Sequence, residues 1–351
     1  MQQGSPRTFR VSFVRHGESV ANVRGEWQGH GDAPLSPRGL EQAAALGERL
    51  RTVPFDWYES SDLIRARNTG ETLGKPLRLN RAFREIHLGA WEGLTRAEVA
   101  ERFPEEVAAL RAGQPVRIGG GESWEDLYVR TSAALDELKA RLEPGQHAVV
   151  FSHGGVVTTV FSGLLGVRGR RPFPIGHVLN TAWSTARFEG SEVFIERYND
   201  GTHHPSCRSW SDAQYEADDA IVTYLAWPED APPPPSLPTE LAEHWLGGVT
   251  RVYADDASHA RPLATSLGAI SVDGIPEVAR PRDLGGAHPG ARVLVITTPE
   301  SVVRAASSAL GGEPADRPRL ATPAPGSLSH VVVSRHGVYL RDYGVGPIPA
   351  R

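Results

Sequence analysis

Four segments from the first half of this chain recur in the second half in the same order. They pair residues 11–22 (VSFVRHGESVAN) with 222–230 (VTYLAWPED), 59–77 with 253–271, 145–166 with 290–311, and 182–198 with 329–343. Because order is kept across all four pairs, the sequence predicts a degenerate internal duplication, in which both halves must adopt one fold. The second copy is shorter: 88 positions separate Arg65 from His153, whereas 39 separate the aligned His259 from Thr298.

Within the first copy, short apolar runs alternate with helical patterns. Strands are expected at 9–14, near 56–60 and at the run HAVVFS, and a closing hairpin is expected around Glu189 and Gly190. Helices are expected over 35–50, with Ser36 as cap and Pro37 in the first turn, over 62–73, and over 155–166. Strands that alternate with helices indicate an α/β class, here a three-layer α/β/α sandwich in tandem duplication.

Composition narrows the class of partner and the compartment. The net charge of −5 argues against nucleic acid or an anionic membrane as the main partner. A single cysteine, Cys207, excludes an intrachain disulfide and is typical of a reducing compartment. The first ten residues lack the apolar core of a signal peptide, and the uncharged apolar stretch 154–167 is too short to span a bilayer. We therefore expect a cytoplasmic protein.

Charged and imidazole side chains follow the expected strands of the first copy. Arg15 and His16 follow the first strand, Arg65 lies after the second, and His153 ends the run AVVFSH. Residues just past the carboxyl ends of strands in an open α/β sheet converge on one crevice. Guanidinium groups suit phosphate oxygens, and a neutral imidazole is a competent nucleophile, so the pattern indicates a phosphate-binding, nucleophilic site.

Five motifs occur together in the first copy and give it a family resemblance. They are VRHGESVAN, SSDLIRARNTGETL, REIHLGAWEG, GGESWEDLYVR and FSHGG, spread over residues 14–155. In this order they resemble the histidine phosphatase superfamily, in its phosphoglycerate-mutase-like group, and the match extends over residues 9 to about 204. With the polar stretch that follows and the internal duplication, this predicts an active copy over 5–204, a linker at 205–217 and a degenerate copy over 218–346.

The resemblance also implies roles for single residues. His16 would be the nucleophile that is transiently phosphorylated, and Glu85 would be the proton donor to the leaving alcohol and then the base for water. The phosphoryl oxygens would be held by Arg15, Arg65, His153 and Asn22, and substrate would be touched by Gln28 and Gly29. Ser61 is interpreted as a support.

The resemblance leaves substrate and cofactor as expectations. It implies a small phosphorylated metabolite as substrate, with no metal and no other cofactor. His203 and His204 lack the spacing of metal ligands.

Two other functions stay open at this stage. A cofactor-dependent phosphomutase would need a grip on a substrate carboxylate, and four arginines could supply it: Arg96, Arg102, Arg111 and Arg117. The 68 positions from Glu85 to His153 and the segment HLGAWEGLTRAEV favour the phosphatase branch. A binding module for phosphorylated ligands would need the first copy to be inactive. The charged faces of LTRAEVAERF and SWEDLYVR are interpreted as solvated surfaces.

The second copy lacks the residues that the chemistry needs. In alignment, Arg15 and His16 become Ala226 and Trp227, Arg65 becomes His259, and His153 becomes Thr298; Glu277 is a doubtful match for Glu85. We expect an inactive copy whose crevice is shallow or filled by Trp227, and which packs on the first copy as an intramolecular pseudo-dimer. The second RHG, in SRHG at 334–337, falls in the turn of the last hairpin and is interpreted as chance.

Overall fold

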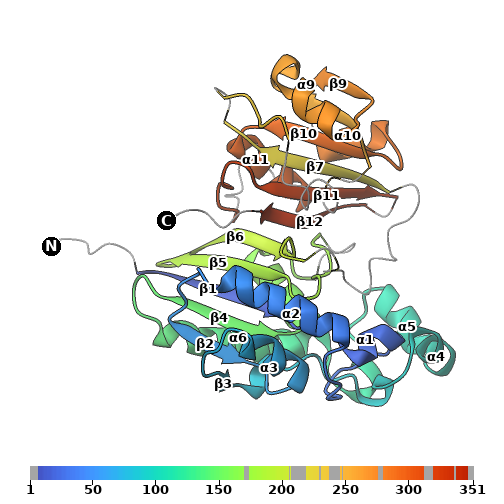
Figure 1. The fold of residues 1–351 in the computed structure, drawn as a ribbon. Coiled ribbons are helices and arrows are strands. Elements are labelled where there is room, and N and C mark those ends of the chain that lie inside the picture. The colour runs from blue at the N-terminus through green and yellow to red at the C-terminus, as the bar shows by residue number, and fades with distance from the viewer. Residues whose placement is uncertain are drawn as a thin grey trace. The chain divides into compact units, whose positions relative to one another are not determined.

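The chain forms two compact units, which are described separately. The structure is a computed structural model that describes residues 7–169, 174–204, 206, 219–228, 231–236, 246, 248–275, 280–311, 319–335 and 337–346 (Figure 1). Unit 1 comprises residues 1–169, 177–193 and 206–210, and unit 2 comprises 170–176, 194–205 and 211–351. The boundaries expected at 204 and 218 remain a prediction, and Cys207, Glu277 and His336 lie outside the described residues.

A mostly parallel sheet forms the centre of unit 1. Its strands are β1 (Thr8–Arg15), β2 (Trp57–Ser60), β3 (Arg78–Leu79), β4 (His147–Ser152) and β5 (Trp183–Glu189), in the order β3-β2-β4-β1-β5. Neighbours run parallel except that β5 is antiparallel to β1. Arg15 pairs with Ser152 in the register of β1 and β4, so the residues that follow these two strands leave the sheet at the same edge.

Within its described residues, unit 1 has seven helices that connect or flank these strands. They are α1 (Val20–Arg24), α2 (Pro37–Leu50), α3 (Ile64–Glu71), α4 (Arg96–Arg102), α5 (Pro104–Arg111), α6 (Trp124–Arg141) and α7 (Gly154–Leu164), with 3₁₀ turns η1 (Arg81–Phe83), η2 (Gly89–Trp91) and η3 (Ile118–Gly120). The expected cap of α2 is confirmed: the Ser36 hydroxyl accepts the Gly39 amide at 3.0 Å, with Pro37 in the first turn. Such a cap contributes about 1 kcal/mol to helix stability.

Helices α3 and α7 cover opposite faces of the sheet. Phe13 of β1 packs against Phe161 of α7, with 6.2 Å between ring centroids. On the next position of the register, Val14 pairs with Phe151, and Phe151 lies against Gly70 of α3. Because successive strand residues point to opposite faces, the two helices lie on either side of the sheet. Unit 1 therefore has the expected α/β layering.

Unit 2 contains a second sheet of the same class. Its strands are β6 (Glu192–Asp200), β7 (Ala220–Ala226), β8 (Val249–Ala254), β9 (Ser271–Gly274), β10 (Arg292–Thr297), β11 (Leu328–Ser334) and β12 (Gly337–Val345). Only the part of β6 from residue 194 onward belongs to unit 2. The strand order is β6-β12-β11-β7-β10-β8-β9. Strands β7, β10, β8 and β9 pair in parallel, whereas β11 is antiparallel to β7. The described helices are α9 (Ala257–Ser266), α10 (Pro281–Ala287) and α11 (Pro299–Ala309).

The second RHG falls where β11 and β12 meet. Ser334, the last residue of β11, pairs with Gly337, the first residue of β12, so the described residues of SRHG agree with the expected place in the last hairpin. Among the described helices, none combines the length and the apolar character that crossing a membrane requires.

Candidate active site

His16 lies directly after β1 and is almost fully buried. Its amide donates to the Ser152 carbonyl at 2.9 Å, which extends the β1–β4 ladder by one residue. Its ring Nδ1 is 2.6 Å from the Gly17 carbonyl oxygen. Since a carbonyl can only accept, Nδ1 carries the proton and, in the neutral ring, Nε2 carries the lone pair. The backbone thus fixes the tautomer whose Nε2 can attack an electrophile.

The environment of His16 keeps its ring neutral. Burial is the largest cause that lowers its pKa well below the ordinary value, and the charges of Arg65 and Arg15 lower it further; the bond to Gly17 opposes them. A neutral imidazole surrounded by cations suits attack on an anionic phosphoryl group, because the cations also attract that group.

Two buried guanidinium groups supply this positive charge. Arg15 at the end of β1 donates to the Val178 carbonyl at 2.6 Å. Arg65, which is 1% exposed in α3, donates to the carbonyls of Gly31 at 2.6 Å and Gly29 at 2.9 Å. Burial lowers the pKa of Arg65 to about 10, so it stays a cation at neutral pH. In the described part of the chain its Nε is buried with no partner, as expected of a donor awaiting an oxyanion.

His153 follows β4 and faces His16. The ring centroids of the two histidines are 5.2 Å apart, and His153 Nε2 is 2.8 Å from the Ser61 hydroxyl. Burial, and then the charge of Arg65, lowers the pKa of His153 well below the ordinary value. Its Nδ1 is buried without a partner among the described residues. With the Ser61 hydroxyl donating to Nε2, Nδ1–H is free to donate to a ligand oxygen, which fits the support role expected for Ser61.

Glu85 approaches this cluster from the irregular segment between η1 and η2. One carboxylate oxygen accepts the Gly155 amide at 3.0 Å and the other accepts the Ile86 amide at 2.9 Å. A Cβ on Gly155 would lie 2.3 Å from Glu85 Oε1, so a larger residue at this position would displace the carboxylate. Glu85 and His153 are therefore joined through the first turn of α7, which begins right after His153.

The remaining predicted residues lie on the segment from α1 to Gly31. Asn22 closes a capping box with Ser19, in which Asn22 Oδ1 accepts the Ser19 amide at 3.1 Å. This bond engages the side-chain oxygen, so the NH₂ group is the part of Asn22 that can donate to another group. Gln28 Oε1 accepts from the Ser19 hydroxyl at 2.8 Å, and the Gly29 carbonyl holds Arg65.

Glu92 is a supporting residue that sequence reasoning missed. Its Oε1 accepts the amides of His30 at 2.8 Å and Leu88 at 3.2 Å, so it ties the loop of Gly29 to the segment that follows Glu85. A Cβ on Gly29 would lie 2.2 Å from the same oxygen. The sequence signal was present in LGAWEG, but nothing in that motif indicates which backbone amides the carboxylate would meet.

The described residues include no group of three or more His, Cys, Asp or Glu side chains arranged to hold a metal ion. The four side chains expected at the strand ends do meet in unit 1, through the strand register and the short contacts given above. Together they form a buried, cationic cluster in which His16 Nε2 carries a lone pair.

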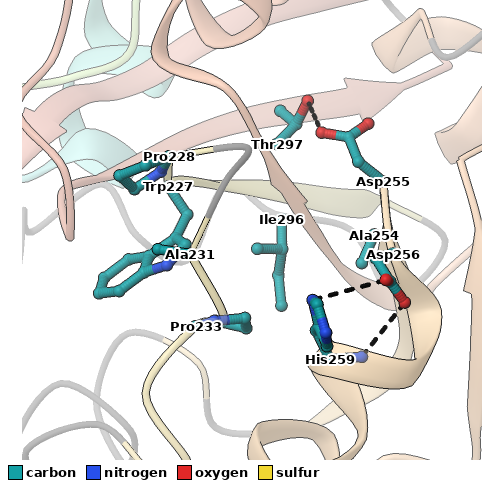
Figure 2. A pocket seen from close by; sticks show the side chains of 10 residues that line it. All are labelled: Trp227, Pro228, Ala231, Pro233, Ala254, Asp255, Asp256, His259, Ile296 and Thr297. Carbon is teal, nitrogen blue, oxygen red and sulfur yellow. Dashed lines mark hydrogen bonds and ion pairs between the residues drawn. The ribbon is translucent and has the colours of Figure 1, made fainter.

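The corresponding strand ends of unit 2 have different side chains, as Figure 2 shows. The crevice there is lined by Trp227, Asp255, Asp256, His259 and Thr297, with Ile296 and prolines. Thr297 donates to Asp255 at 3.1 Å, and His259 lies 3.4 Å from Asp256. The volume of this cavity is about 30 Å³.

Comparison with known proteins places the first half of the chain in a family. Residues 11–201 match the model of the histidine phosphatase superfamily (branch 1). The chain is 32% identical over 202 residues to the metal-independent phosphoserine phosphatase of Arabidopsis thaliana, covering 55% of this chain and 82% of that protein. It is 33% identical over 189 residues to the glucosyl-3-phosphoglycerate phosphatase of Mycobacterium tuberculosis, covering 51% and 85%.

A mutase and a solved structure show the same relationship. The 2,3-bisphosphoglycerate-dependent phosphoglycerate mutase 2 of Gloeobacter violaceus is 32% identical over 157 residues, covering 42% of this chain and 72% of that protein. The structure of mycobacterial hydrolase 1 is 31% identical with a TM-score of 0.51, covering 55% of this chain and 99% of that one. The chain belongs to the histidine phosphatase superfamily, and it is a phosphatase.

Proposed function

We propose that this phosphatase hydrolyses phosphomonoesters without a metal, through a phosphohistidine on His16. The observation that carries the proposal is the tautomer of His16: the bond from Nδ1 to the Gly17 carbonyl leaves the Nε2 lone pair for attack on phosphorus. Arg15, Arg65 and His153 then hold the phosphoryl oxygens and neutralise the charge that spreads over them in the transition state.

Glu85 completes the two half-reactions. In the first, the His16 Nε2–P bond forms, the P–O bond to the leaving group breaks, and the Glu85 carboxylic acid gives its proton to the departing oxygen. In the second, Glu85 takes a proton from water, the water oxygen bonds to phosphorus, and the P–N bond breaks. The carboxylate next to Gly155 supports this role, because the start of α7 brings it close to His153.

The test is phosphate release from a panel of phosphomonoesters in the presence of a chelator. The panel includes phosphoserine and glucosyl-3-phosphoglycerate, the substrates that the names of two relatives give. Release by the wild type, none by His16→Ala, and an acid-labile phosphoenzyme in a rapid quench are the expected results. Equal release by the His16→Ala protein would overturn the proposal.

A phosphomutase is the second candidate, because one relative is a mutase. Two of the four arginines that could grip a substrate carboxylate are already paired with acids: Arg102 lies 3.8 Å from Glu98 and Arg117 lies 3.1 Å from Asp126. This pairing favours the phosphatase. A mutase would require a bisphosphate primer, so activity that is absent until such a primer is added would favour the mutase. A module that only binds phosphorylated ligands would bind phosphate yet release none from any ester.

We further propose that unit 2 is an inactive copy of unit 1. Strand order and direction support the duplication: β9-β8-β10-β7-β11 repeats β3-β2-β4-β1-β5, with the antiparallel strand in the same place. Trp227 donates its amide to Thr297 as His16 does to Ser152, so Trp227 stands at the nucleophile position. A cavity lined by Trp227 and two carboxylates does not suit an anionic phosphate ester, because the carboxylates repel it.

The expected association of the two copies can be tested by truncation. Residues 194–205 belong to unit 2 although they precede its main part, and Tyr198 of β6 pairs with Tyr343 of β12. A fragment ending at residue 210 lacks these partners, so we expect it to aggregate or to lose thermal stability. A soluble, monomeric and fully active fragment would contradict an association that the catalytic copy needs.

A further inference from the structure

The segment that carries Glu85 has no regular secondary structure to fix it. Glu85 lies between η1, which ends at Phe83, and η2, which begins at Gly89. A proton donor must be placed to within a fraction of an ångström of the departing oxygen, and an irregular segment does not provide this by itself. Another part of unit 1 must therefore hold this backbone.

Arg130 of α6 binds three carbonyls of this segment. Its guanidinium donates to the Ala82 oxygen at 2.8 Å, to the Arg84 oxygen at 3.0 Å and to the Glu85 oxygen at 3.1 Å. The planar guanidinium group fixes the angles between its donors, so three bonds to one short segment fix the orientation of that backbone as well as its position.

Glu122 in turn fixes Arg130. The two side chains form a two-pronged pair, with Nε to Oε1 at 2.8 Å and a terminal nitrogen to Oε2 at 2.7 Å. Glu122 also reaches the far side of the segment: its Oε2 accepts the His87 amide at 2.9 Å, and its own amide donates to the His87 carbonyl at 2.8 Å. Burial opposes the charge, but the bond from Arg130 and the His87 amide leave the pKa of Glu122 below its ordinary value, so the pair is ionised at neutral pH.

These contacts correct the interpretation of SWEDLYVR as a simple solvated surface. The side chains of Arg130 and Glu122 are only 23% and 20% exposed, and both act on the backbone on either side of Glu85. We propose that Arg130, held by Glu122, is a positioning residue for the general acid: it sets the distance from the Glu85 carboxyl to the leaving oxygen. The inference rests on the acid role proposed for Glu85.

The dependence of the rate on the leaving group separates positioning from general stability. Protonation matters for an alkoxide but little for 4-nitrophenolate, which departs readily as an anion. Arg130→Gln should lower kcat/KM for glycerol 2-phosphate by about 10- to 100-fold, as expected for a misplaced proton donor. For 4-nitrophenyl phosphate the same variant should lose less than about 3-fold. The ratio of the two rates in one preparation does not depend on the folded fraction.

Matched variants sharpen the experiment. Arg117→Gln removes a guanidinium that bonds Gly121 and Asp126 at the start of α6 but makes no described bond to 82–87, so the ratio should stay unchanged. Glu122→Gln should change the ratio in the same direction as Arg130→Gln but less. The double variant should match Arg130→Gln rather than the product of both losses. Arg130→Lys keeps the positive charge but lacks the planar, multi-donor guanidinium group. The ratio of the two rates should therefore lie between those of the wild type and Arg130→Gln.

Glu85→Gln distinguishes the failure of this inference from the failure of the proposed function. It should lose activity mainly on glycerol 2-phosphate; equal losses on both esters would refute the acid role itself. Suppose that Glu85→Gln loses activity mainly on glycerol 2-phosphate but Arg130→Gln leaves the ratio of the two rates unchanged. The positioning role of Arg130 is then wrong. If Arg130→Gln does not fold, Glu122→Gln gives the same test.

Discussion

Strand β1 of unit 1 and strand β7 of unit 2 end in the same backbone arrangement. His16 follows β1, and Trp227 follows β7. The His16 amide donates to the carbonyl of Ser152, and the Trp227 amide donates to the carbonyl of Thr297; both acceptors end the neighbouring parallel strand. The side chains differ completely: unit 1 gathers two guanidinium groups and two neutral imidazoles, whereas unit 2 has Trp227, Asp255, Asp256 and His259. The comparison teaches that sheet register fixes where side chains converge, but not what they can do there.

The largest effect on kcat should come from substitution of His16, the first residue after β1. His16→Ala should lower kcat by about 10⁴-fold or more, as removal of a covalent nucleophile does elsewhere. Trp227→Ala should change kcat by less than about twofold at equal folded fraction, because residues that share no interaction partners act independently. Steady-state kinetics with a phosphomonoester measures both. A comparable loss in the Trp227 protein would show that the His16 and Trp227 sites are coupled.

The next effect should appear at the first turn after the second strand. Arg65→Ala removes a buried cation and should lower kcat/KM by about 10²- to 10³-fold, the usual loss for one well-placed oxyanion donor. It should also weaken inhibition by vanadate. His259→Ala at the matching position of unit 2 should leave both quantities within about twofold. Equal losses of kcat/KM in the Arg65→Ala and His259→Ala proteins would show that the two units do not differ in function at this position.

A smaller effect is expected at Ser61. Ser61→Ala removes the hydroxyl 2.8 Å from His153 Nε2 and so frees the ring tautomer. Loss of a single neutral hydrogen bond of about 1 to 1.5 kcal/mol corresponds to roughly a 5- to 15-fold lower kcat/KM. Asp255→Ala in unit 2 serves as the control. An unchanged rate in the Ser61 protein would show that His153 is oriented by other contacts.

The last substitution concerns stability, and its effect on catalysis should be the smallest. Burial lowers the pKa of His147 at the start of β4 to about 3, while the unfolded chain titrates near 6.5. Between these pH values the unfolded state binds the proton and the folded state does not, so this residue makes stability fall as the pH falls below about 6.5. The slope is at most about 1.4 kcal/mol per pH unit. His147→Gln should flatten the decline of the unfolding free energy, measured with urea between pH 7 and 5, and leave kcat unchanged.

Much of unit 1 followed from sequence because its signals are local. The cap at Ser36, the apolar run of β4 and the positions of His16 and His153 after their strands are set by neighbours in the chain. The contacts of Glu92, Glu122 and Arg130 could not be predicted, since each depends on backbone groups brought near by folding. A sequence shows that such residues are charged, but not which carbonyl or amide they will meet.

Strand β6 pairs with β12, which is synthesised much later, and this delay affects folding during biosynthesis. Tyr198 pairs with Tyr343, so this strand leaves the ribosome well before the strand that completes its edge. At about 5 to 20 residues per second, the wait is on the order of ten seconds. An unpaired strand edge is a template for wrong pairing, so the nascent chain is most vulnerable in this interval. Premature termination in the second half would leave the edge of β6 that meets β12 without its native partner.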